Sequence, residues 1–212
     1  MRPMTRPTIA DKRARFRQLH ASGCFVLPNP WDVGSARWLQ GLGFAALAST
    51  SSGLAWSQGA ADNRITRQQA LDHLRTLVDA TDLPVNADFE NGFGDSPAAG
   101  GDVLLVGRAE CFLVGQPDID ATITRLQAYA AAGADVLYAP GIQQPGHIRA
   151  VVAAVAPKPV NLLVGSPSPM TVADIAALGV RRISVGGALA RSAWGGFMRS
   201  ARVLAEQGRF DG

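Results

Sequence analysis

Short apolar segments alternate with helical segments along almost the whole chain, and this alternation restricts the fold more than any other feature of the sequence. Parallel strands need a long crossover between them, usually a helix, so a repeated β–α order indicates a parallel sheet. The strand-like segments are rich in Val, Leu and Ala, as in sheets covered on both faces. The sequence therefore predicts an α/β fold, for which a (β/α)8 barrel and an open doubly wound sheet compete.

We expect one domain over residues 1–212, with residues 1–9 as a flexible arm and residues 51–64 as a polar loop. Seven strands are predicted, at residues 24–28, 44–50, 84–90, 103–108, 136–140, 160–165 and 182–185. Helices are predicted at residues 11–21, 31–41, 67–80, 144–156, 171–178 and 188–207, with another that Asp118 caps and that runs to about residue 132.

Polar residues at the carboxyl ends of the predicted strands favour the barrel over the open sheet, because barrel active sites lie at that face. A complete barrel would have eight strands, one more than the pattern predicts. The connector at residues 91–102 holds five glycines or prolines and is too short for the usual helix. We therefore predict a TIM-type (β/α)8 barrel in which one βα unit is missing after the third strand. The strand-end residues are Asn29, Ser49, Asp88, Arg108, Asn161 and Gly186.

Charge and composition argue against nucleic-acid and membrane partners. The net charge is +3, but the arginines are scattered, and the one dense basic group fits the solvated face of a helix. No apolar run has the length of a membrane span. The two cysteines have no zinc-like or redox spacing, so we expect a reducing, cytoplasmic location.

Asp88 and Glu90 are the strongest candidates for a metal site. They stand two residues apart at the end of a predicted strand, a spacing that points both side chains to one side. Two neighbouring carboxylates repel each other unless a cation or a shared proton joins them. Oxygen ligands of this kind suit Mg²⁺ or Mn²⁺. The alternative is that both residues only flank a turn.

Three further residues are open to a functional and a structural interpretation. Arg108 follows an apolar strand, where its planar guanidinium could bind a carboxylate in bidentate fashion or could form a structural ion pair with Asp88, Glu90 or Glu110. Asp62 lies in the predicted loop and could be a surface turn residue. Asn161 could bind substrate or cap a loop.

Several segments, taken together, resemble the isocitrate lyase/phosphoenolpyruvate mutase superfamily, within its members similar to 2-methylisocitrate lyase and carboxyvinyl-phosphonate phosphonomutase. The most specific is Ala-Asp-Phe-Glu-x-Gly-Phe-Gly at residues 87–94. The other matching segments are residues 27–32, 51–55 leading to Asp62, 84–86, 106–110, 131–135, 159–163 and 183–189.

The resemblance implies a barrel that forms homo-oligomers by exchange of a C-terminal helix. It implies Mg²⁺-dependent cleavage or rearrangement of a C–C or P–C bond next to a 2-oxo or 2-hydroxy acid, with a small oxo-acid or phosphonate as substrate. Asp88 matches the family's metal-binding aspartate, and Glu90 stands for its near neighbour. Asp62 matches a catalytic loop aspartate and Arg108 the substrate-binding arginine. Thr50, Ser51 and Ser52 fall where the family holds the other end of the substrate.

The family also has a helix, a fourth strand ending in a Glu-Asp pair and a gating loop, none of which has a counterpart after residue 94. Two hypotheses from different classes therefore stand. One is a Mg²⁺-dependent lyase or phosphonomutase-like enzyme. The other is a shortened, non-catalytic relative that keeps the barrel and a ligand site. A third, weaker hypothesis is an unrelated barrel that binds phosphate at the Gly165 and Gly186 corners.

Overall fold

The computed structural model describes residues 6–90 and 103–212, and its strands are all parallel. The strands are β1 (Phe25–Leu27), β2 (Leu47–Ala48), β3 (Val85–Asn86), β4 (Val106–Arg108), β5 (Val136–Tyr138), β6 (Val160–Leu163) and β7 (Arg182–Ser184). The helices are α1 (Ile9–Ala21), α2 (Val33–Gly41), α3 (Ser51–Ser57), α4 (Arg67–Ala80), α5 (Ile119–Ala131), α6 (Pro145–Val155), α7 (Val172–Ala177) and α8 (Ala188–Gln207).

The strands form a barrel-type wall that is open on one side. Five strands pair in the order β1-β7-β6-β5-β4, and β2 pairs with β3. The two sheets join where the Ala48 N–H donates to the Pro28 carbonyl at 3.0 Å, just beyond the end of β1. In the described part of the chain, β3 and β4 form the two ends of this wall and share no ladder. The prediction of a TIM-type barrel short of one βα unit is therefore confirmed, although residues 91–102 lie outside the description.

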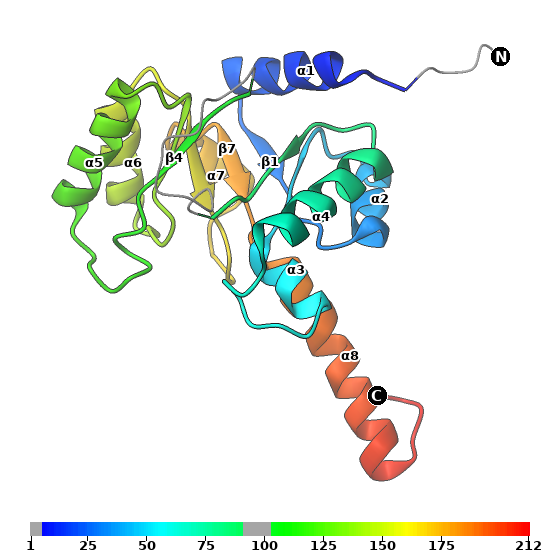
Figure 1. The fold of residues 1–212 in the computed structure, drawn as a ribbon. Coiled ribbons are helices and arrows are strands. Elements are labelled where there is room, and N and C mark those ends of the chain that lie inside the picture. Colours follow the sequence, from blue (N-terminus) through cyan, green and yellow to red (C-terminus); the bar gives the residue numbers. More distant parts are fainter. Residues whose placement is uncertain (1–5, 91–102) are drawn as a thin grey trace.

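Buried side chains fill the wall and the layer of helices behind it. The largest cluster, which includes Leu126, Leu137, Ile148 and Leu162, joins β5, β6 and β7 to α5, α6 and α7. A smaller cluster packs α2 and α4 against β2. Phe16 of α1 lies in a further cluster with Leu27 of β1 and Ala48 of β2, so α1 packs against the wall. Figure 1 shows α8 projecting away from the body at the opposite end from α1.

Capping side chains set the beginnings of four helices, as the sequence pattern indicates. Thr8, Asp32, Thr66 and Thr171 each accept a hydrogen bond from the third residue of the helix, and that residue's side chain bonds back to the cap. Such reciprocal capping satisfies amide groups that a helix start leaves unpaired. The four helices therefore begin directly after residues 8, 32, 66 and 171, where local hydrogen bonds of the cap favour a helix start.

Two expectations about loops were wrong. Residues 51–57 form α3 instead of a polar loop, and the Thr50 hydroxyl caps it by accepting from the Gly53 N–H. Within the expected arm, Arg6 donates hydrogen bonds to the carbonyls of Asp79 and Thr81 and forms an ion pair with Asp82 at 2.7 Å. Because these partners lie at the end of α4 and just after it, residues 6–8 are held against the barrel, and Ile9 already belongs to α1; the rest of the expected arm lies outside the described residues.

The third strand is also shorter than predicted, and this changes the argument for the two carboxylates. The strand was expected over residues 84–90, but β3 ends at Asn86. Glu90 has φ 49°, which is in the left-handed region and not in a strand. The period of two therefore does not set the directions of Asp88 and Glu90; the loop after β3 does.

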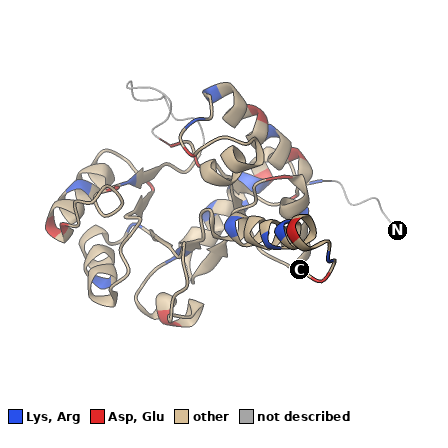
Figure 2. Ribbon diagram, turned by 90° about the horizontal axis from the view of Figure 1, so that it is seen from below, with Lys and Arg blue, Asp and Glu red and all other residues tan. Residues whose placement is uncertain are grey.

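Basic and acidic residues are both spread over several helices in the view from below (Figure 2). Among the helices of residues 6–90 and 103–212, none is both long enough and apolar enough to cross a membrane.

Candidate active site

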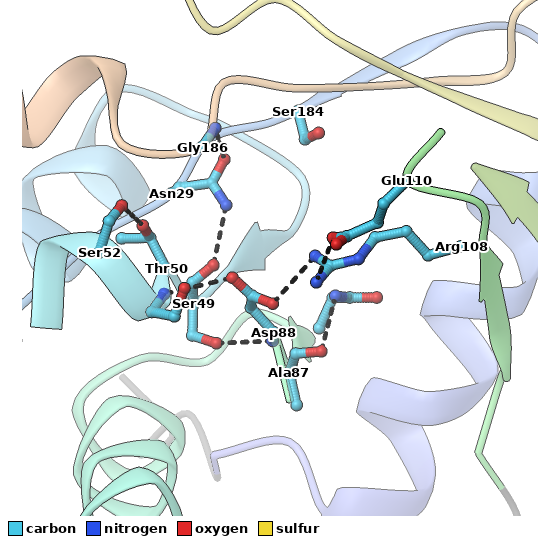
Figure 3. A network of polar contacts seen from close by, with 12 residues as sticks. Asn29, Ser49, Thr50, Ser52, Ala87, Asp88, Arg108, Glu110, Ser184 and Gly186 are labelled. Atoms are coloured by element: carbon cyan, nitrogen blue, oxygen red, sulfur yellow. Dashed lines mark hydrogen bonds and ion pairs between the residues drawn. The ribbon is translucent and has the colours of Figure 1, made fainter. Parts of the chain in front are cut away.

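Asp88 lies at the centre of a polar network at the carboxyl ends of β2, β3 and β4 (Figure 3). Its Oδ2 accepts a hydrogen bond from the Ser51 N–H at 3.2 Å, at the start of α3. Its own N–H donates to the Ser49 Oγ at 2.8 Å. The Asp88 carboxylate is thus fixed by groups from the β2–α3 junction, which lies 37 to 39 residues earlier in the chain.

Arg108, the last residue of β4, joins Asp88 to a second carboxylate. Its Nη1 lies 3.4 Å from Asp88 Oδ1, and its Nη2 lies 2.9 Å from Glu110 Oε1. In this structure Arg108 therefore forms the ion pairs with Asp88 and Glu110 that the structural interpretation of this residue predicts. The same guanidinium reaches the Asp88 side chain across the open side of the wall (Figure 3), so it borders the site that was predicted for it.

Glu90 lies in an acidic environment. Burial raises the pKa of its carboxyl group, and the charges of Asp88 and Asp62 raise it further, while Arg108 lowers it. Asp62 itself is exposed in the loop between α3 and α4, where its Oδ1 accepts from the Asn63 N–H at 3.1 Å. The structure therefore places Asp88 and Asp62 near enough to Glu90 for their charges to raise its pKa.

Asp88 and Glu90 line one small cavity. The cavity has a volume of about 10 Å³, about the space of one water molecule. Its polar lining also includes residues 49–51 and His73 of α4. The His73 Nε2 atom is buried and has no hydrogen-bond partner among the described residues, and burial lowers the pKa of this imidazole. The sequence could not show that α4 places His73 in the lining of this cavity.

The three hydroxyl residues predicted to bind substrate serve different purposes. The Thr50 side chain is buried, caps α3 and lies 3.1 Å from Ser52 Oγ. Ser51 uses its backbone amide for Asp88. Ser51 and Ser52 keep partly exposed side chains at this corner, whereas Thr50 is mainly structural.

Asn161 does not have the surroundings expected of a substrate-binding amide. It lies inside β6 and is 1% exposed. Its Oδ1 accepts from Arg182 Nε at 2.8 Å, and its Nδ2 donates to Ser184 Oγ at 2.9 Å. Both ends of the amide are thus used in the barrel interior, and the prediction for Asn161 is corrected to a structural role.

The buried Arg182 is an interior residue that the sequence analysis missed. Its Nη1 donates to Asn86 Oδ1 at 3.2 Å, and burial lowers the pKa of the guanidinium to about 10. The sequence contained a signal for this role, because Arg182 belongs to a predicted apolar strand and arginine is rarely found in such strands. Arg182 links β7 to β6 and β3, because its guanidinium donates to the neutral amide oxygens of Asn161 and Asn86.

Backbone groups near Gly165 and Gly186, after the last two strands, already have hydrogen-bond partners within the protein. The amides of Val185 and Gly186 donate to Asn29 Oδ1, both at 2.9 Å, while Asn29 Nδ2 donates to the Ser49 carbonyl. The Gly165 carbonyl accepts from Arg191. Asn29 therefore uses the amide groups that a phosphate would need at the Gly186 corner.

The donor chemistry at Asp88 and Glu90 fits Mg²⁺. Within residues 6–90 and 103–212, no three His, Cys, Asp or Glu side chains are grouped so that they could hold a metal ion. Mg²⁺ is commonly held by one or two carboxylates together with water and substrate oxygens, so two protein ligands are enough. The mutual repulsion that raises the pKa of Glu90 is the kind of strain that a divalent cation relieves.

Fold and site together define an α/β barrel protein with an acidic, arginine-bordered site at the carboxyl ends of its strands. The sequence matches the phosphoenolpyruvate phosphomutase family over residues 16–102 and 97–205, so the chain belongs to this family within the phosphoenolpyruvate mutase/isocitrate lyase superfamily.

Relatives support the same placement. An uncharacterised protein of Mycobacterium tuberculosis is 30% identical in an alignment of 213 positions that covers 81% of this chain and 81% of that protein. A crystal structure of a candidate lyase/mutase from Burkholderia cenocepacia is 41% identical and has a TM-score of 0.88, with 94% of this chain and 90% of that chain covered. A phosphonopyruvate hydrolase in complex with oxalate and Mg²⁺ has a TM-score of 0.81 over 94% of this chain and 89% of that chain; at 21% identity it shows the fold alone.

Proposed function

We propose that this protein is a Mg²⁺-dependent enzyme of the lyase or phosphonomutase type. It would cleave or rearrange a C–C or P–C bond next to the oxo or hydroxy group of a small acid or phosphonate. The observation that carries the proposal is that Asp88 and Glu90 line one cavity while Arg108 contacts Asp88 at the mouth of the barrel.

The acidic residues of the site would bind the metal ion, and the arginine would bind the anionic substrate. Asp88 and Glu90 would hold Mg²⁺, which as a Lewis acid stabilises negative charge that develops on an oxo-acid. Asp88 is already fixed by Ser51 and Ser49, so its oxygen atoms need little reorganisation.

Arg108 would bind the substrate carboxylate or phosphonate, exchanging its contact with Asp88 or Glu110 for a bidentate one. Asp62 would act from the loop beside Glu90 as a proton acceptor or nucleophile, and Ser51 and Ser52 would contact the other end of the substrate. The assignment of Asp62 rests on the family resemblance and on its electrostatic effect on Glu90.

We further propose that copies of this chain associate through α8. This helix projects from the body (Figure 1) and exposes Phe197, Met198 and Leu204 at 62%, 55% and 48%. An open hollow of about 230 Å³ between Trp31 and Trp194 continues the apolar surface. Exposed apolar surface of this kind is typical of an interface.

Calorimetric titration with Mg²⁺ and oxalate tests the metal site. The wild-type protein should bind oxalate only with Mg²⁺ present, and Asp88→Ala should weaken this binding by more than about 100-fold because the site loses a charged ligand. Arg108→Ala should retain Mg²⁺ binding and lose oxalate affinity. Asp72→Ala, which changes an exposed carboxylate on α4, serves as the matched control. Binding that is equal in the wild-type and Asp88→Ala proteins would disprove the assignment.

The second candidate function is that of a non-catalytic relative with a ligand site. It is favoured by the lack of a ladder between β3 and β4 in the described part of the chain, which leaves the wall open there. Measured turnover of phosphoenolpyruvate, oxaloacetate or 2-methylisocitrate would exclude this candidate. Oxalate binding without turnover of any of the three would favour it.

A further inference from the structure

Asn29 joins three strand ends at the mouth of the barrel through one buried side chain. The residue follows β1 and is 5% exposed. Its Oδ1 accepts from the N–H groups of Val185 and Gly186 after β7, both at 2.9 Å, and its Nδ2 donates to the Ser49 carbonyl after β2 at 2.8 Å. Figure 3 shows the side chain between Gly186 and Ser49. Both ends of the amide are therefore bonded to backbone groups of other strand ends.

The prolines on either side of Asn29 explain why a side chain makes this connection. The Ala48 N–H donates to the Pro28 carbonyl and so joins the two sheets. Pro30 has no N–H with which to extend that pairing. A proline also favours an extended conformation of the residue before it. The Asn29 amide therefore supplies the next donor across the junction of the sheets.

Ser49, the residue that Asn29 holds, is fixed by three hydrogen bonds and reaches Asp88. Its N–H donates to the Asn86 carbonyl at 2.9 Å, its carbonyl accepts from Asn29, and its Oγ accepts from the Asp88 N–H at 2.8 Å. Two residues further on, the Ser51 N–H donates to Asp88 Oδ2 at 3.2 Å. This short segment thus holds both the backbone and the carboxylate of Asp88 (Figure 3), and Asn29 anchors the peptide group at its start.

Asn161 is a similarly buried asparagine whose hydrogen bonds lead elsewhere. It is 1% exposed, and its amide bonds the side chains of Arg182 and Ser184 in the barrel interior. Replacing it removes buried hydrogen bonds without touching the link through Ser49. Asn161 therefore serves as a matched control for a change at Asn29.

We propose that Asn29 is a positioning residue of the metal site, which acts through Ser49 and sets the orientation of the Asp88 carboxylate. This inference rests on the proposed function, because Asp88 is the metal ligand that Asn29 orients. Ligands of a metal ion need hydrogen-bond partners that hold them in place, and loss of such a partner commonly weakens metal binding by about 10- to 100-fold. Since Asn29 also binds the Val185 and Gly186 amides, it connects the orientation of Asp88 to the end of β7.

Calorimetric titration with Mg²⁺ alone compares the wild type with Asn29→Ala, Ser49→Ala and the double variant. Asn29→Ala should weaken Mg²⁺ binding roughly tenfold or more, and Ser49→Ala should also weaken it. The double variant should weaken binding by less than the product of the two single effects, because both changes break one chain of contacts. Asn161→Ala should lose stability in urea unfolding and keep the Mg²⁺ affinity of the wild type.

The amide proton of Asp88 reports the same link in the metal-free protein. Its chemical shift depends on the hydrogen bond to Ser49 Oγ, so it should move in Asn29→Ala and in Ser49→Ala and stay in place in Asn161→Ala. If Asn29→Ala does not fold, the wild-type protein with ¹⁵N-labelled asparagine decides the matter. Mg²⁺ should then shift the side-chain amide signals of Asn29 more than those of Asn161.

The outcomes separate the two proposals. If Mg²⁺ affinity is equal in wild type and Asn29→Ala, or if Asn161→Ala weakens it as much, the assignment of Asn29 is overturned and the proposed function stands. Single effects that multiply in the double variant, or Asn29 signals that do not respond to bound Mg²⁺, overturn the assignment in the same way. If the wild-type protein binds no Mg²⁺, both proposals are overturned.

Discussion

Glu90 combines two unfavourable features at one residue. Its φ of 49° is uncommon for a residue other than glycine or asparagine, and its carboxyl group lies in the field of Asp88 and Asp62. Residues held in such conformations often belong to functional sites, where the surrounding structure enforces them. Here the strain and the repulsion both occur at a predicted metal ligand.

The raised pKa of Glu90 leads to a prediction about pH. The folded state favours the neutral carboxyl group, so its contribution to stability is present below the pKa of the unfolded chain and is lost as the pH rises through the folded pKa. Without Mg²⁺, Glu90→Gln should therefore be more stable than wild type at pH 7, by less than about 1 kcal/mol because the group is only partly buried and solvent screens its charge. The difference should shrink as the pH falls toward 4.

Urea unfolding between pH 4 and pH 8 measures this difference. Glu206→Gln, on the exposed side of α8, is the control and should show no comparable gain. With saturating Mg²⁺ the order at pH 7 should reverse, because only the wild type keeps both proposed ligands. A Glu90→Gln protein that is less stable than wild type at pH 7 without metal would contradict the prediction.

At the scale of elements, α3 is the main difference between expectation and structure. It has seven residues, too few for a clear helical periodicity, and it contains Gly53 and four Ser or Trp positions that do not mark a helix. Tertiary packing stabilises it instead: Leu54 and Ala55 are buried against Ile65 and Ala70. The helix matters for the site because its first amide holds Asp88.

Gly53→Ala should destabilise the protein by about 1 to 3 kcal/mol. A Cβ atom at this position would lie 2.6 Å from Thr50 Cγ2 and 2.8 Å from Trp31 Cβ, so α3 would have to move. Movement of α3 would also shift the Ser51 amide away from Asp88 and weaken Mg²⁺-dependent oxalate binding.

The matched control is Gly146→Ala in α6, where a new Cβ atom meets nothing within 4 Å. A helical alanine is favoured over glycine by up to about 1 kcal/mol, so this variant should be neutral or more stable. Chemical denaturation of the three proteins compares them directly. Equal stability of Gly53→Ala and the wild type would show that α3 is not packed as described.

At the scale of the whole molecule, the projecting helix α8 leaves apolar side chains exposed to solvent. If α8 mediates self-association, Phe197→Glu should shift the protein to a smaller species, because it places a charge in the apolar surface beside Trp194. Size-exclusion chromatography with light scattering gives the mass of each species. Val172→Glu, at an exposed apolar position on α7, should not change the mass. An unchanged mass for Phe197→Glu would argue against association through this face.

The barrel architecture could be predicted because its signals are local and repeat many times. Six of the eight helices in the described part of the chain begin at a capping side chain, and most strands are short apolar runs between turn residues, so one misjudged element such as α3 leaves the architecture intact. The strand ends could not be placed to the residue. They depend on which neighbour supplies hydrogen bonds, and β2 and β3 each form only a two-residue ladder.

The sequence by itself determined the alternation of strands and helices, the family, and the acidic and basic residues that border the site. Only the tertiary structure decided what those side chains do. It joined Asp88 to Ser51 and Arg108, and it turned Asn161 inward to Arg182. The physical reason is that secondary structure follows from neighbours along the chain, whereas a side chain's hydrogen bonds and charge state follow from groups that are distant in sequence and close in space.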